Sequence, residues 1–179
     1  MRLTAVILAN LSAFIVSAST LPKTPPAPSR LNITTIAAAS DKSTLECWQL
    51  SAPFVQSSQA GTSGAVIAQL GETGATSYSL IPSQFDGGFH NAPVVQYVAF
   101  TSGLAVVSLP NSTRTATIPG GRNGLILATD TTNVSTLGHK TVYPSKEVTV
   151  GIQIPTRDNE IPLHTVLHAG PCTRGEMDQ

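Results

Sequence analysis

Short apolar runs separated by strong turn residues constrain the fold of this chain more than any other feature. The runs are rich in Val, Ile and Thr, which favour strands, and each ends at Gly, Pro, Asn or Ser. Helical periodicity is weak, and the two helix candidates are 32–39 and 131–137. Many short strands predict an all-β domain, a single antiparallel β-barrel or jelly roll with little helix. The runs cover 45–50, 64–70, 76–81, 94–100, 104–109, 113–118, 124–128, 147–154 and a last stretch before Cys172.

The N-terminus is typical of a signal peptide. Met1 and Arg2 precede an apolar run, and small residues follow it up to Ala18. The run is too short and too interrupted to span a bilayer comfortably, so a membrane anchor is the less favoured alternative. We therefore expect a secreted, extracellular protein with no membrane partner after cleavage. Its expected parts are a signal peptide over 1–18, a Pro-rich arm over 19–40, the β-barrel domain over 41–174 and a C-terminal tail over 175–179.

The balance of charges excludes one class of partner. Charged residues make up 11% of the chain, and the formal net charge is +0. A nucleic-acid-binding protein needs a basic surplus to displace counterions, so no nucleic-acid partner is expected. The hydrophobic fraction of 41% combined with zero net charge indicates a folded chain rather than a disordered one.

Two cysteines and three sequons agree with export. Cys47 and Cys172 lie near the two ends of the expected domain, and in an oxidising compartment they would form a disulfide. Two free buried thiols are the alternative. The sequons predict glycosylation at Asn32, Asn111 and Asn133.

The segment 88–103 carries a degenerate form of a known motif. The first motif of the cupin family reads His, any residue, His, three or four residues, Glu, six residues, Gly. His90, Gln96 and Gly103 occupy the first His, the Glu and the Gly positions, while Ala92 replaces the second His.

The segment 118–128 is similar to the second cupin motif. Pro119 and Gly121 match its Pro-x-Gly, whereas Gly124 and Ala128 replace its His and Asn. Other runs, among them FDGGFHNAP and GLILATDT, resemble small secreted cupin-like proteins of filamentous fungi. The resemblance implies a cupin-like barrel over roughly 45–172, and a cupin-like dimer is compatible with it.

The same resemblance implies a site inside the barrel. Cupins bind metal through three imidazoles and one carboxylate, but here His90 stands alone and Gln96 is a weak, neutral ligand. His139, in the connection after Gly138, and Asp130 could complete a displaced site for Zn²⁺ or Cu²⁺. A cavity without a cofactor, in which His90 is only hydrogen-bonded, is the favoured alternative.

Two tyrosines are further candidates for this site, whereas two other histidines are not. Tyr97 and Tyr143 are candidates for its wall, Tyr143 being nearer to His139 in sequence. His164 and His168 lie four apart on an expected strand, about 13 Å from one another, which is too far to share an ion.

Three functions fit these patterns. The favoured one is a small-molecule-binding barrel whose site is built around His90 and Gln96. The second is a cupin-type enzyme, metal-dependent or metal-free, that acts on a small metabolite as an oxidoreductase, isomerase or cyclase. The third is a structural or host-interaction surface protein.

Cleavage after Ala18 predicts a mature protein that begins near Ser19. N-terminal sequencing of the protein from culture medium checks this prediction. Recovery of chains that keep Met1 in the membrane fraction would contradict it.

Overall fold

The computed structural model describes residues 29–110 and 112–178. The predictions on the signal peptide, on the arm as far as residue 28 and on Asn111 therefore lie outside the described residues. Strands make up most of the ordered structure, as predicted. They are β1 (Arg30–Ala39), β2 (Lys42–Pro53), β3 (Val55–Gln56), β4 (Val66–Ile67), β5 (Ser77–Ile81), β6 (Phe85–His90), β7 (Gln96–Ser102), β8 (Leu104–Ser108), β9 (Thr115–Pro119), β10 (Leu125–Ala128), β11 (His139–Tyr143), β12 (Thr149–Pro155) and β13 (His164–Ala169).

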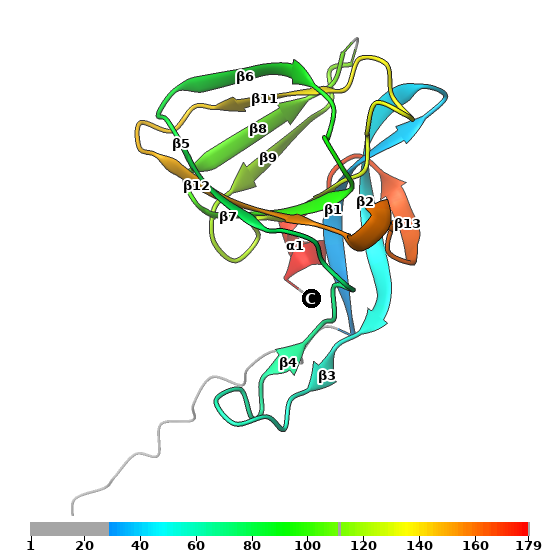
Figure 1. Ribbon diagram of the computed structural model, residues 1–179, viewed down its shortest axis with the longest axis vertical. Helices are drawn as coiled ribbons and strands as arrows, with labels where there is room; N and C mark the ends of the chain where they lie inside the picture. The colour runs from blue at the N-terminus through cyan, green and yellow to red at the C-terminus, as the bar shows by residue number, and fades with distance from the viewer. Residues whose placement is uncertain (1–28, 111, 179) are drawn as a thin grey trace, which may run out of the picture.

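Two sheets face one another across the upper part of the molecule (Figure 1). The larger has seven strands in the order β13-β2-β1-β10-β7-β12-β5, and the smaller has four in the order β6-β11-β8-β9. All named strand pairs are antiparallel except β1 with β10. Within the described residues the hydrogen-bonded ladders do not close into a barrel, so the expected barrel becomes two open sheets. A separate two-stranded sheet, β3-β4, extends from the lower end.

The main core lies between the two sheets. Ile36, Val98 and Phe100 of the larger sheet belong to one buried cluster with Val107 and Ile118 of the smaller sheet. Alternate residues of a strand point to opposite faces, so each of these strands presents every second side chain to this core.

The larger sheet buries its other face as well. Ile33, Trp48 and Tyr97 form the centre of a second core cluster, with Leu70 and Ile154 packed against it. A sheet buried on both faces explains why its strands read as nearly continuous apolar runs.

Two helix predictions were wrong. The segment 32–39 belongs to β1, because Ile33, Thr34, Thr35 and Ile36 are β-branched and the strand pairs with a neighbour on each side. The arm therefore ends before Arg30, not at residue 40. The segment 131–137 forms turns and bends. The regular helical structure described is a 3-10 turn, Arg157–Asn159, and the short helix α1, Arg174–Met177, within the predicted tail.

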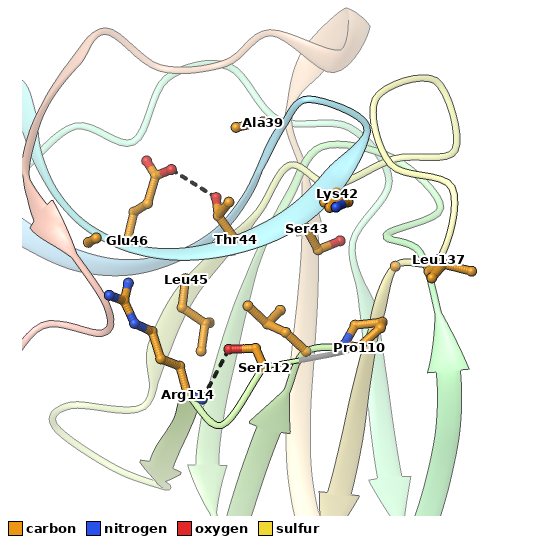
Figure 2. Close-up of a pocket in the computed structure, with 13 residues that line it drawn as sticks. Ala39, Lys42, Ser43, Thr44, Leu45, Glu46, Pro110, Ser112, Arg114 and Leu137 are labelled. Carbon is orange, nitrogen blue, oxygen red and sulfur yellow. Dashed lines mark hydrogen bonds between the residues drawn. The ribbon is translucent and has the colours of Figure 1, made fainter.

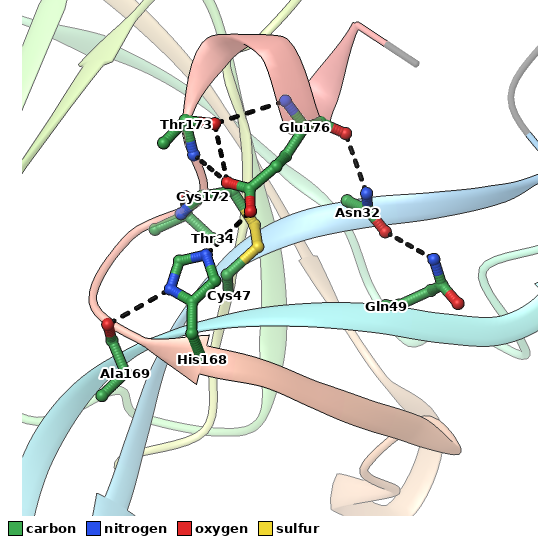
Figure 3. Close-up of polar contacts among 9 residues, drawn as sticks. All are labelled: Asn32, Thr34, Cys47, Gln49, His168, Ala169, Cys172, Thr173 and Glu176. Atoms are coloured by element: carbon green, nitrogen blue, oxygen red, sulfur yellow. Dashed lines mark hydrogen bonds and ion pairs between the residues drawn. A yellow bond between two sulfur atoms is a disulfide. The ribbon is translucent and has the colours of Figure 1, made fainter.

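The predicted disulfide is present between Cys47 and Cys172, with 4.5 Å between their Cα atoms. It joins β2 to the segment that leads into α1 (Figure 3). The cysteines are 125 residues apart, so the cross-link is expected to stabilise the fold by about 4–5 kcal/mol in the chain-entropy model.

The crossing from β7 to β8 takes the chain from one sheet to the other at Gly103. Its φ is 78°, in the region that favours glycine, and a Cβ there would lie 2.7 Å from the Cα of Thr149. Gly121 has a φ of 99°, but a Cβ there would meet nothing within 4 Å. These two positions share the backbone strain and differ in the space around them.

We expect Gly121→Ala to lower the free energy of unfolding by about 1–2 kcal/mol, from the positive φ alone. Gly103→Ala should cost about 1–3 kcal/mol more, because the backbone of Thr149 cannot move aside. Urea unfolding of both variants measures the difference. Equal losses would contradict this account of the crossing.

Candidate functional site

A cavity of about 210 Å³ lies between the two sheets. Core side chains form most of its wall, among them Ile36, Val98 and Phe100. Six polar side chains converge on it, which distinguishes it from an ordinary packing gap. These are His90, Gln96, His139, Thr141, Tyr143 and Gln153.

His139 is the most firmly held of these groups. The sequence predicts His139 in a connection, but it is the first residue of strand β11. It is 4% exposed. Its Nδ1 lies 2.8 Å from Oδ2 of Asp130. A carboxylate accepts hydrogen bonds, so Nδ1 of His139 carries a proton, and Nε2 is the ring nitrogen left for contacts in the cavity.

Asp130 is fully buried behind His139 and does not line the cavity. Strand β10 ends at Ala128, two residues before Asp130. Besides His139, Oδ2 accepts a hydrogen bond from Ser43 Oγ at 2.6 Å, and Ser43 in turn lies 2.8 Å from Ser135 Oγ. The other carboxylate oxygen, Oδ1, is buried without a partner among the described residues. This network fixes the orientation of the His139 ring.

His90 lies at the mouth of the cavity rather than inside it, because its side chain is exposed. The segment Asp86-Gly87-Gly88 resembles a turn in sequence but is a bulged part of β6, in which two residues face Thr141 of β11. The bulge aims His90 along β6, so that its Nδ1 donates to Gly88 O at 3.1 Å. Its ring centroid is 4.5 Å from that of His139.

The surroundings of His90 favour its neutral form. Loss of water around the ring lowers its pKa below the usual 6.5, and the neighbouring His139 lowers it further. The carbonyl of Gly88 and the charge of Asp130 oppose this shift without cancelling it. At neutral pH the ring therefore offers Nε2 as an acceptor.

Gln96 and Tyr143 line the cavity, as the sequence led us to expect. Burial raises the pKa of Tyr143, and its ring packs edge-on to Phe100 at 6.1 Å. Tyr97, the other candidate, faces the second core, where burial raises its pKa to about 12.

Gln153 is a cavity residue that sequence reasoning missed. Its Oε1 accepts hydrogen bonds from Ser77 and Ser79, both at 2.9 Å, which leaves its amide nitrogen as a donor. It lies on β12 opposite Val98, and this long-range pairing, which places it in the cavity, leaves no signal in the sequence.

The predicted three-ligand metal set is not assembled. Among the described residues, the group of three with ligand atoms within 4.8 Å of one another is a different one, Cys47, His168 and Glu176. Asp130 cannot join His90 and His139 around one ion because it bonds the Nδ1 side of His139, away from the cavity.

The spacing of the first cupin motif implies that His90 and Gln96 lie on one hairpin, and they do not. His90 ends β6 in the smaller sheet, while Gln96 begins β7 in the larger one, so the two side chains reach the cavity from opposed sheets. The glycine ends of the two motifs do meet, since Gly120 N donates to Gly103 O and Gly121 N donates to Phe100 O.

One predicted glycosylation site is incompatible with the packing. Asn32 is 9% exposed, and its Nδ2 donates to Glu176 O at 2.8 Å, so a sugar on this nitrogen would have to displace α1. Asn133 is exposed in the turn after Asp130, and its glycosylation stays a prediction.

A second hollow, of about 390 Å³, lies between the start of β2 and the loop after β8 (Figure 2). Leu45, Leu109 and Leu137 supply apolar wall, and Lys42 and Arg114 lie at its border. The carboxylate of Glu46, which also lines this hollow, already accepts hydrogen bonds from Thr44 and Trp48. The smaller cavity is the stronger candidate because two imidazoles and two amides line it together with core side chains.

Comparison of the chain with models of protein families, with curated proteins and with solved structures finds no match. No helix within the described residues is long and apolar enough to cross a membrane.

We expect His90 to titrate below the usual histidine range and His168 above it. Hydrogen bonds to Ala169 O and to Glu176 raise the pKa of His168, so the two rings should shift in opposite directions. Because the folded state depresses the pKa of His90, its contribution to stability is present above pH 6.5 and is lost as the pH falls through the folded value.

Histidine NMR signals followed against pH measure both pKa values. His139→Gln should raise the pKa of His90 part of the way and leave that of His168 unchanged. A pKa of His90 at or above the ordinary value in the folded protein would contradict the arrangement.

Proposed function

We propose that this protein binds a small, neutral, hydrogen-bonding molecule in the cavity between the two sheets. The observation that carries the proposal is the convergence of two imidazoles, two amides and a phenol in a wall of core side chains. Binding sites with this composition fix a ligand by a few polar groups while the apolar wall supplies affinity.

The hydrogen-bonding state of the polar groups favours a ligand that donates. Nδ1 of His90 donates to Gly88 O, and Nδ1 of His139 donates to Asp130 Oδ2. Nε2 of each ring is therefore left to accept a hydrogen bond from the ligand. Gln153 contributes a donor nitrogen, because its oxygen is occupied by two serine hydroxyls. A molecule with hydroxyl or N–H groups near one end would satisfy both rings.

The volume limits the size of this molecule. At about 210 Å³ the cavity is smaller than the roughly 300–1,000 Å³ of typical drug-sized sites. It equals the liquid volume of about seven water molecules at about 30 Å³ each. A single ring with a few substituents fits this space.

An acid–base enzyme is a second candidate, favoured by the Asp130–His139 pair. A buried carboxylate that holds Nδ1–H of an imidazole leaves Nε2 as a proton acceptor, which is the arrangement of a general base. On a bound metabolite it could remove a proton in an isomerisation or cyclisation, without a metal ion.

Cupin-like ancestry and export are part of the proposal. The glycine ends of the two motif-like segments lie together at the sheet crossing, which supports a relation to the jelly-roll architecture. The Cys47–Cys172 disulfide supports an oxidising compartment.

Ligand-observed NMR with paired fragments tests the proposal. We expect catechol to bind more tightly than its dimethyl ether, because methylation removes the donors that face His90 and His139. His90→Gln and Gln96→Leu should each weaken catechol binding by about tenfold, a loss typical of one hydrogen bond.

His164→Gln is the matched control. Its ring stacks on Trp48 at 3.4 Å, and Trp48 belongs to the second core cluster, on the other face of the larger sheet. Circular dichroism verifies that each variant is folded. Equal binding of both fragments, or equal effects of His90→Gln and His164→Gln, would contradict binding in this cavity.

A further inference from the structure

A cluster of three potential metal ligands lies at the other side of the larger sheet, next to the disulfide. One ligand atom each of Cys47, His168 and Glu176 lie within 4.8 Å of one another. Figure 3 shows His168 and Glu176 directed at one another beside the sulfur atoms. His168 belongs to the His164/His168 pair that the sequence excluded as a shared metal site, and here it acts apart from His164.

The fold holds the three groups in place. β13 pairs with β2 so that His168 lies opposite Cys47, just after a register shift in β13. Nε2 of His168 is 2.9 Å from Oε1 of Glu176. The other carboxylate oxygen, Oε2, accepts hydrogen bonds from the backbone N–H and the hydroxyl of Thr173, which caps α1.

In the oxidised protein the sulfur of Cys47 is bonded to Cys172 and is not a thiolate, which is the form that binds metals. We propose that reduction of this disulfide creates a binding site for a borderline divalent ion such as Zn²⁺, formed by Cys47, His168 and Glu176. This proposal is independent of the function proposed for the cavity between the sheets.

Reduction of the disulfide and binding of the ion are two separate steps. A dithiol reductant supplies two electrons and two protons, the S–S bond breaks, and Cys47 and Cys172 become thiols while the reductant becomes a disulfide. When the ion binds, the Cys47 thiol and Nε2 of His168 each lose one proton to solvent. The nitrogen, oxygen and sulfur donors form a set that Zn²⁺ favours.

The distance between the imidazole and the carboxylate requires little rearrangement, and the sulfur of Cys47 lies within 4.8 Å of both. Two ligand atoms about 2.1 Å from a tetrahedral ion are about 3.4 Å apart. Nε2 of His168 and Oε1 of Glu176 need to separate only slightly from their present 2.9 Å to accept an ion in place of the proton they share. The fourth position of the ion stays open to the freed Cys172 thiol or to water.

The ion would take over the task of the disulfide. Cys47 belongs to β2, His168 to β13 and Glu176 to α1, so one ion would join the same elements that the covalent bond now joins. The C-terminal segment could thus be fastened under oxidising or reducing conditions.

Co²⁺ absorption spectroscopy on the full chain tests this inference. Cys172→Ser frees Cys47 without a reductant, which matters because Cys47 is 0% exposed. We expect one Co²⁺ per chain with a thiolate charge-transfer band in this variant, displaced by Zn²⁺, and no band in the oxidised wild-type protein. Adding His168→Ala or Glu176→Gln to Cys172→Ser should weaken Co²⁺ binding at least tenfold.

Adding His164→Gln to Cys172→Ser is the matched control and should leave Co²⁺ binding unchanged. Failure of Cys172→Ser to show the band would overturn the inference, as would equal binding in the His168→Ala variant. If Cys172→Ser is unfolded without metal, recovery of its β-sheet circular dichroism with Zn²⁺ supports the site, and no recovery overturns it.

Discussion

The placement of β1 inside the larger sheet, between β2 and β10, is the constraint on which the rest of the structure depends. This strand pairs antiparallel with β2 and parallel with β10, so it joins the N-terminal hairpin to the strands of the cavity. Its alternate residues serve both cores, since Ile33 packs in one and Ile36 in the other. Thr34, between them, accepts a hydrogen bond from the backbone N–H of Cys172 and ties the strand to the disulfide segment.

The polar side of the cavity depends on the same arrangement. Ser43 is the second residue of β2, and it reaches the buried carboxylate of Asp130 beyond the end of β10. That carboxylate then orients His139 on the opposed sheet. A buried charge is stable only when hydrogen bonds satisfy it, so the position of β1 relative to β10 is transmitted to the ring that faces the cavity.

Much of the strand pattern could be predicted from sequence because period-two burial and Gly or Pro turns are local signals. β5, β7, β8, β9, β10 and β12 lie where the runs of Val, Ile and Thr indicated. β1 was missed because its Ala37-Ala38-Ala39 end also suits a helix, and only pairing on both sides decides for strand. β6 was missed because two adjacent glycines resemble a turn, whereas here they form a bulge.

The candidate site was only partly predictable for a related reason. His90, Gln96, His139 and Tyr143 do line one cavity, but the motif register wrongly placed His90 and Gln96 on one hairpin. Which sheet a strand joins is set by long-range pairing, which no local spacing records. Gln153 and the Ser43–Asp130 contact, separated by 87 residues, could not be found from sequence for the same reason.

The opposed origin of His90 and Gln96 has a mechanical consequence. Because no ladder closes the two sheets into a barrel within the described residues, their separation at the cavity is held by side-chain packing rather than by backbone hydrogen bonds. A molecule that is hydrogen-bonded to His90 on one sheet and to Gln96 or Gln153 on the other would link the two sheets directly. Binding of this molecule would reduce the motion of the two sheets relative to one another. Residues far from the cavity would then become more rigid as well.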